Sequence, residues 1–136
     1  MPVEQLAYGY DPDFVSPGDG AAHNAVTVTL APNNTYSVRC RVIARGLTDG
    51  LSAMMEKQAI VKSVSGGNLA LVGAVVTLFT AQGDTGTGTW AVNFSLSGLG
   101  IVVSVTGSAS QRVAWSFLFE VYGFTNVNVA GVGEIP

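Results

Sequence analysis

Charged side chains are scarce in this chain of 136 residues, at 11% against about a quarter in an average soluble protein. The six Lys and Arg residues form no cluster, and the formal net charge is −3. Nucleic acids and anionic membranes are bound through concentrated positive charge, so the composition argues against both kinds of partner. Disorder is also disfavoured, because disordered chains are rich in charge, whereas 48% of this chain is hydrophobic.

Cysteine and histidine each occur once, which limits the chemistry that the chain can perform. Cys40 has no second cysteine to pair with, so no disulfide forms within the chain. Its place in the alternating segment YSVRCRV predicts a small buried side chain rather than a reactive thiol. His23 has no partners at the spacing of a metal site or a catalytic triad, so we expect no metal, no cofactor and no catalysis there.

Targeting and membrane-spanning segments are also missing from the pattern. The opening MPVEQLAYGYDPDF has neither a basic start nor an apolar run, which argues against a signal peptide. No stretch reaches the 18 or so uninterrupted apolar residues of a membrane-spanning helix. We therefore expect a protein made and folded in a reducing cytoplasm.

Alternation with period two dominates from residue 25 onward and predicts strands separated by short turns. Residues 53–64 fit a helical turn or a strand, and their alternation favours the strand. Residues 69–81 are apolar throughout, which is typical of a strand buried on both faces or of a bend at Gly73 that switches sheets. About eight strands with no amphipathic helix indicate an all-β, antiparallel β-sandwich, jelly-roll-like, over residues 25–124. Its core should contain Trp90, Phe94, Trp115 and Phe117.

Residues 1–24 differ from this domain and predict an extended N-terminal arm. They hold three of the five prolines and four of the nine acidic residues, together with separated apolar side chains. A flexible tail seldom carries such apolar residues, so they need a surface to bury against. That surface belongs to a partner or, alternatively, to the arm's own domain. The candidate capsid- or partner-binding residues are Leu6, Tyr8, Tyr10, Phe14 and Val15, and residues 125–136 form a semi-apolar C-terminal tail.

The strongest catalytic motif is Asp84-Thr85-Gly86, the triplet of aspartic proteases. In those enzymes the Asp follows a buried apolar strand, whereas Asp84 lies among glycines and fits a solvated turn. We therefore expect no enzyme, and the isolated charges Glu56, Lys57 and Arg112 should serve solubility or salt bridges at subunit contacts.

Residues 66–123 resemble a β module of virion proteins from tailed bacteriophages. The resemblance rests on GGNLALVGAVVTLF, then TWAVNFSLSGLGIVVSVTG, then RVAWSFLFEVYG, where Gly73, Trp90, Gly107 and Trp115 occupy the matching positions. The family often has a second acidic residue in its last strand, where this chain has Phe119 before Glu120. Trp115 is then a core residue or an interface residue.

The resemblance implies a structural virion protein, and the first expectation is a capsid decoration (cement) protein on the outer surface of a phage head. Its partners would be the major capsid protein and copies of itself. Few charges on an apolar chain favour a homo-oligomer, and the resemblance alone implies a trimer. The alternative is a tail-fibre or tail-spike module that binds a host receptor or glycan. That role calls for exposed aromatic residues on the loops at residues 45–50 and 82–88, which contain none.

Overall fold

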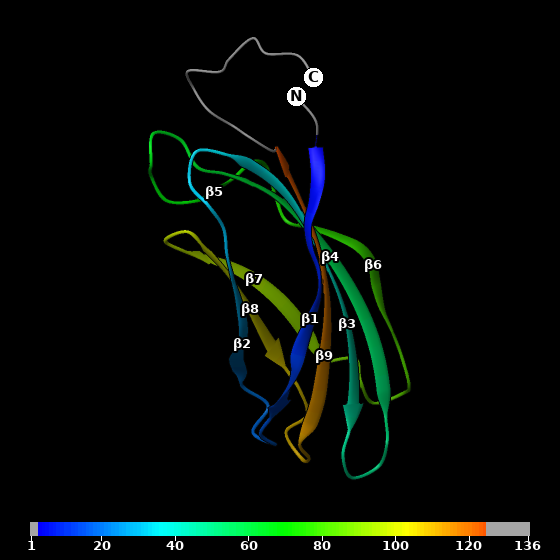
Figure 1. Cartoon of the computed structure of the whole chain (residues 1–136). Coiled ribbons are helices and arrows are strands. Elements are labelled where there is room, and N and C mark those ends of the chain that lie inside the picture. The colour runs from blue at the N-terminus through cyan, green and yellow to red at the C-terminus, as the bar shows by residue number, and fades with distance from the viewer. Residues whose placement is uncertain (1–2, 125–136) are drawn as a thin grey trace.

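A computed structural model of the chain describes residues 3–124, with the side chains of residues 14–78 and 82–124. This part of the chain contains strands and no helix, which confirms the all-β prediction (Figure 1). The strand at residues 53–64 is likewise confirmed. The nine strands are β1 (Val3–Ser16), β2 (Ala22–Thr29), β3 (Thr35–Gly46), β4 (Ser52–Lys62), β5 (Ala70–Leu71), β6 (Val76–Gly83), β7 (Ala91–Ser97), β8 (Gly100–Thr106) and β9 (Val113–Phe124).

The strands form two sheets, and every pairing is antiparallel, so the predicted sandwich is confirmed. The large sheet has the order β1-β9-β3-β4, and both β5 and β6 pair with β4. The small sheet has the order β2-β8-β7. The connections β1–β2, β2–β3, β6–β7 and β8–β9 cross between the sheets, which joins the two layers at both ends (Figure 1).

The core lies between the sheets and follows the period-two pattern of the sequence. Two pairs of buried residues lie opposite each other on β3 and β9, namely Val38–Val121 and Cys40–Phe119. Alternate residues of a strand face the same side, so these positions line the inner face of the large sheet. Of the four predicted core residues, Trp90, Trp115 and Phe117 are buried, and Phe94 is partly buried against the core. The small sheet contributes Val26, Val92, Ile101, Val103 and Val105.

Trp115 lies in the core and not at an interface, because it is fully buried in the chain itself. Its ring centroid is 6.2 Å from that of Trp90. Its indole N–H donates to the hydroxyl oxygen of Ser16 at 2.9 Å, and that hydroxyl lies 3.4 Å from the carbonyl oxygen of Val113, to which it donates. Gly107 lies beside this group, where an added Cβ would stand 2.8 Å from the Ser16 hydroxyl. One buried serine therefore satisfies the polar atom of the largest core side chain.

Replacing Ser16 by Ala should lower the free energy of unfolding by about 1–3 kcal/mol, because the buried indole N–H of Trp115 then lacks an acceptor. Urea denaturation followed by tryptophan fluorescence measures the change. Ser116→Ala, at an exposed position of β9, is the matched control and should leave stability within about 0.5 kcal/mol. Equal midpoints for the two variants would contradict the role given to Ser16.

Cys40 is fully buried on β3, as the sequence predicts. Burial, with a smaller effect of the charge on Glu56, raises the pKa of the Cys40 thiol from 9.0 to about 12. Since the folded-state pKa is the higher one, this thiol costs no stability below about pH 9, and stability falls as the pH rises from there towards 12. At neutral pH the side chain is a small apolar group in the core.

A thiol reagent at pH 8 should therefore react with Cys40 only when the domain unfolds. We expect the reaction of the native protein to be at least roughly a thousandfold slower than in urea, as global stabilities of single domains allow. A colorimetric thiol assay with and without urea gives both rates. Rapid labelling of the native protein would mean that the β3–β9 region opens locally.

The prediction that residues 69–81 are buried on both faces is wrong. Within the part whose side chains are described, four of the five large apolar residues after Leu69 are exposed, namely Leu71, Val72, Val76 and Leu78, and Val75 is half-buried. Gly73, with φ at +79°, does interrupt the segment, but the chain stays in one sheet because β5 and β6 both pair with β4. A run of apolar letters does not distinguish burial inside the domain from an apolar surface.

Candidate interaction surfaces

The predicted arm is extended, and its backbone forms β1 along the edge of the large sheet. β1 runs antiparallel to β9 from the pair Val3–Phe124 to the pair Ser16–Val113. This is the fold-back alternative, in which the arm lies against its own domain. Of the five candidate anchors, Leu6, Tyr8 and Tyr10 belong to this strand, and their side chains lie outside the described residues.

The other two anchors are divided between the core and the surface. Phe14 lies opposite Trp115 and packs against the core, whereas Val15 lies opposite Ala114 and is 44% exposed. Of the two anchors with described side chains, Val15 is thus exposed and Phe14 is partly buried. Their role in binding a capsid stays a prediction.

The ladder between β1 and β9 is interrupted at Asp11, Pro12 and Asp13. Tyr10 pairs with Phe117 and Phe14 with Trp115, so three residues of β1 face one residue of β9. Proline has no N–H to give to the ladder, and an excess of residues on one strand produces a bulge. Two further register shifts lie at Gln5/Ala7 and Ala7/Gly9. The regular pairing of Phe14–Ser16 is therefore separated from the remainder of β1.

Truncation of the arm should separate these two parts of β1. A protein that lacks residues 2–20 has lost Ser16, the hydrogen-bond acceptor of Trp115, whereas a protein that lacks residues 2–13 keeps it. The melting temperature of the first protein should therefore be well below that of the second. The difference should be roughly 3–5 °C for each kcal/mol lost in a domain of this size. Differential scanning fluorimetry compares both with the full chain. A deletion of residues 2–20 that leaves melting unchanged would contradict the structural role of β1.

The outer face of the large sheet, turned away from the small sheet, carries an ionic cluster. Glu56 on β4 accepts from Nε of Arg41 at 3.1 Å and lies 3.5 Å from Nε of Arg39. The Glu56 side chain is only 7% exposed, whereas the two arginines remain about half exposed. The expectation that Glu56 serves solubility is therefore wrong: its charge is covered and paired within the chain.

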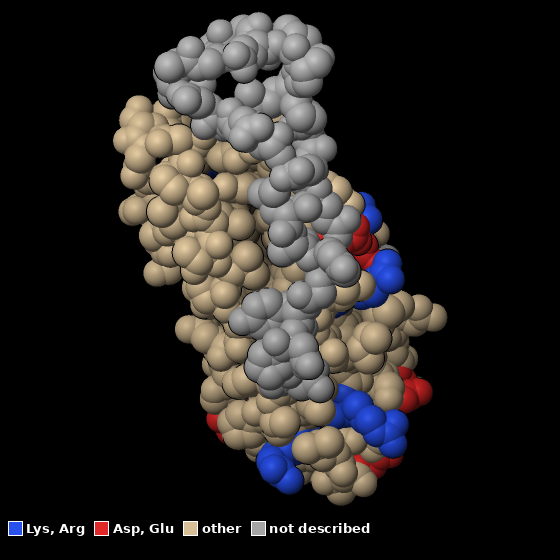
Figure 2. All heavy atoms as spheres, in the orientation of Figure 1, with Lys and Arg blue, Asp and Glu red and all other residues tan. Residues whose placement is uncertain are grey.

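Beside this cluster, Tyr122 donates its hydroxyl to Glu120 at 3.2 Å, and Glu120 lies opposite Arg39 on the neighbouring strand. The hydrogen bond to Glu120 raises the pKa of the Tyr122 hydroxyl above its usual value. In Figure 2 the charged side chains gather mainly along one side and at the lower end of the visible face. The charges of the two glutamates and the two arginines thus balance on this face of the sheet, and the arginine side chains remain partly exposed to solvent.

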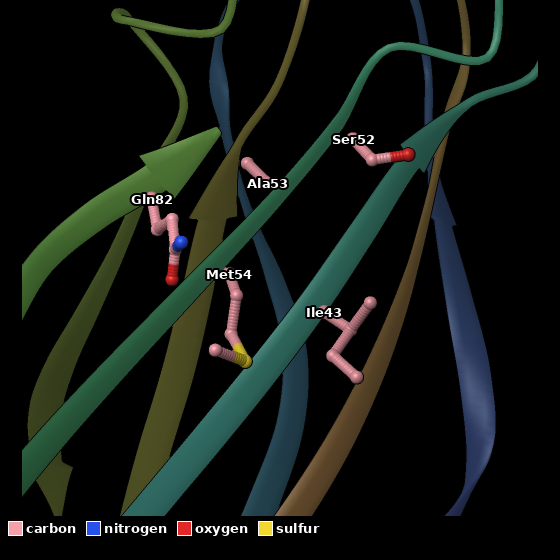
Figure 3. Close-up of a pocket in the computed structure, with 5 residues that line it drawn as sticks. All are labelled: Ile43, Ser52, Ala53, Met54 and Gln82. Atoms are coloured by element: carbon pink, nitrogen blue, oxygen red, sulfur yellow. The ribbon is translucent and has the colours of Figure 1, made fainter. Parts of the chain in front are cut away.

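A shallow hollow of about 260 Å³ lies on the large sheet near the β3–β4 turn (Figure 3). Its lining comes from three neighbouring strands, with Ile43 on β3, Met54 on β4 and Gln82 on β6. None of its lining residues has a titratable side chain, so they supply neither a general acid nor a nucleophile of the cysteine type. The complete lining is Ile43, Ser52, Ala53, Met54 and Gln82.

Four loops meet at the end of the sandwich where β1, β3, β6 and β8 finish. Gln111 joins two of them: its Oε1 accepts from the backbone N–H of Thr48, and its side-chain amide donates to Asp49. The backbone N–H of Leu51 and the Gln111 amide lower the pKa of Asp49 below its usual value. A polar glutamine buried at this end thus holds the hairpin at residues 47–51 against the loop at residues 107–112.

Asp84, the Asp of the protease-like triplet, is a turn residue at this same end. Its exposed carboxylate accepts from the backbone N–H of Ser52 at 2.9 Å, and its carbonyl accepts from Thr87. His23, expected to stand alone, pairs with Asp19 through Nε2 at 2.9 Å. The spacing of four residues in a turn-rich segment was the available signal for that contact. Asp84 thus joins its turn to the start of β4, whereas Asp19 fixes a contact within the β1–β2 connection and the first residues of β2.

Among the described side chains, those of residues 14–78 and 82–124, no group of three or more metal-ligating side chains comes together. No helix within residues 3–124 has the length and apolar character to cross a membrane. Three features of the described part could contact another molecule: the apolar residues around β5 and β6, the ionic cluster, and the loop end.

No protein-family model matches the chain, and no curated protein matches it in sequence. Its antiparallel sandwich does have a counterpart among solved structures, in the tailspike protein of Acinetobacter baumannii phage AM24. The TM-score is 0.55 at 12% sequence identity, and the match covers 93% of this chain and 27% of that chain. The chain thus spans about a quarter of the length of the tailspike protein. At this identity the likeness shows a common fold, with both sheets of this chain included.

Proposed function

We propose that this chain is a structural protein of a bacteriophage virion and, more finely, a β-sandwich module of a tailspike or tail fibre. The observation that carries the proposal is the fold shared with a phage tailspike protein over 93% of this chain. The resemblance of residues 66–123 to virion β modules points independently to the same class of protein.

The loop end of the sandwich fits a module that supports neighbouring parts of the tail better than one that binds a host receptor or glycan. Sugar rings bind against exposed aromatic faces, and the loops at residues 47–51 and 84–89 have no aromatic residue. Trp90, which follows directly, is 4% exposed. Hydrogen bonds of Gln111 and Asp84 fix these loops, which favours a rigid end over an adaptable one. The module would hold its neighbours in place within a larger assembly.

Capsid decoration, the first expectation from the sequence, is also a structural role in a virion. It requires many more copies per particle than a role in the tail. Decoration proteins cover a shell and must be present at a level comparable to the major capsid protein. A tail component is present at a small fraction of that level. Copy number therefore separates the two roles without any knowledge of the host receptor.

Quantitative mass spectrometry of purified particles should give a low ratio of this chain to the major capsid protein, and immunogold labelling should mark the tail. A ratio near that of the capsid protein, with label over the head, would contradict the tail assignment and favour decoration. Absence from purified particles would overturn both. The major capsid protein serves as internal standard, because its copy number is fixed by the shell.

A further inference from the structure

The apolar surface of this molecule is concentrated on one segment. Of the eleven large apolar side chains exposed in the described part, six lie between residues 60 and 78. No charged residue occurs between Lys62 and Asp84. Single exposed apolar residues are ordinary, but a contiguous uncharged group of them marks an interaction surface. We call this group the β5–β6 patch; it consists of Ile60, Val64, Leu71, Val72, Val76 and Leu78.

The strand register places part of the patch in one row on the outer face. Val72 lies beside Ile60, whose carbonyl accepts the Val72 N–H at 2.8 Å, and Val76 lies opposite Gln58. Gln58 and Ile60 are two residues apart on β4, so they share a face. Ile60 and Val72, the residue directly after β5, therefore lie side by side, and Val76 lies beside Gln58, the next residue of β4 on the same face. Each of the three apolar residues is 43–52% exposed.

The patch also includes an open sheet edge. β6 pairs with β4 on one side, and no other strand among residues 3–124 pairs with it on the other (Figure 1). Natural proteins protect such edges with lysine, proline or a covering segment, since an unpaired edge recruits a strand from another chain. β6, with the sequence VTLFTAQG, has neither charge nor proline. Its edge has the composition of a strand that is paired in the finished assembly.

We propose that a second copy of this chain covers the β5–β6 patch, with β6 forming backbone hydrogen bonds to the neighbouring copy. The partner must match an uncharged apolar surface and an unpaired strand edge, and another copy of β6 supplies both. None of the six patch residues is charged, but two lysines border them: Lys57 donates to Thr77 at 3.4 Å, and Lys62 shares a face of β4 with Ile60. The proposal concerns the isolated chain and does not rest on its role in a virion.

The exposed area is sufficient for such a contact. Leu71 lies opposite the buried Val61 and so faces the other side of the sheet from Val72, which means that the contact must wrap around the open edge to cover all six side chains. Their exposed fractions add up to nearly three whole side chains, or roughly 300 Å² of apolar surface at about 100 Å² each. Interfaces are a little over half apolar, so each copy would bury roughly 500 Å² in all. Two copies then reach about 1,000 Å², the lower limit for a specific interface. The patch thus suffices for association but not for a very tight complex.

The test is analytical ultracentrifugation of the full chain over a wide concentration range, with the double variant Val76→Lys, Leu78→Lys. Wild type should associate, and the double variant should bind itself at least roughly a hundredfold more weakly, since each lysine must be desolvated at the interface. Both positions are partly exposed in the monomer, so its melting temperature should be unchanged. Ser95→Lys is the matched control, because it adds a lysine at an exposed position of β7, an edge strand of the small sheet.

Hydrogen exchange gives a second readout that does not depend on substitution. The amides of β6 should exchange more slowly at high protein concentration than at low concentration, while those of β7 do not change. A wild type that stays monomeric, equal dissociation by Ser95→Lys, or β6 exchange that is independent of concentration would each overturn the proposal. Binding of the patch by a different phage protein, with no self-association, would overturn it as well. The expected assembly is a dimer, because β6 has one open edge and can pair with only one other copy of β6.

Discussion

The position of β9 between β1 and β3 is the constraint on which the rest of this structure depends. On its inner face β9 contributes a buried column from Val113 to Val121, in which Trp115 packs against Trp90, the residue directly before β7 of the small sheet. Its two edges are paired over most of their length. Because Trp115 also brings an N–H into the core, Ser16 must lie beside it, and this requirement fixes where the end of β1 enters the sandwich. The first and last strands, which are paired along their edges, are thereby also linked inside the core through the hydrogen bond from Trp115 to Ser16.

Charge distribution follows from the same architecture. The inner faces accept almost no polar groups, and most of the charges among the described side chains lie on the outer face of the large sheet and in the loops at one end. Lys57, opposite Cys40 on β3, reaches Thr77 on β6 instead. Glu56 is the exception in burial, and its two arginines neutralise it locally. The aspartates at the loop end accept backbone N–H groups that the turns would otherwise leave unpaired, as Asp84 does for Ser52. Few charges suffice because most of them have a structural task.

The strands with clear alternation, such as β3 and β9, could be predicted from the sequence, because apolar residues mark the face toward the core and polar residues mark the face toward solvent. The all-β class, the buried Cys40 and the core tryptophans followed from that pattern. The place of β1 could not be predicted, since its partner lies about a hundred residues away and local letters do not encode that pairing. The prediction for the β5–β6 patch was wrong for a different reason. Hydrophobic residues indicate that a surface is to be buried, but they do not indicate whether the same chain or another molecule buries it. The burial of the Glu56 side chain depends on residues of neighbouring strands, and a short stretch of sequence around Glu56 does not include them.

The pairing of Val3 with Phe124 has a geometrical consequence. The domain's described backbone begins and ends on adjacent strands at one end of the sandwich, while the loops around Gln111 lie at the other (Figure 1). A unit with that geometry can be inserted into a longer polypeptide as a side branch, because the path of the host chain is interrupted by little more than the spacing of two strands. Flanking segments would leave together, and the loop end would point away from them. Evolution can thus move such a unit between unrelated long proteins without rebuilding either.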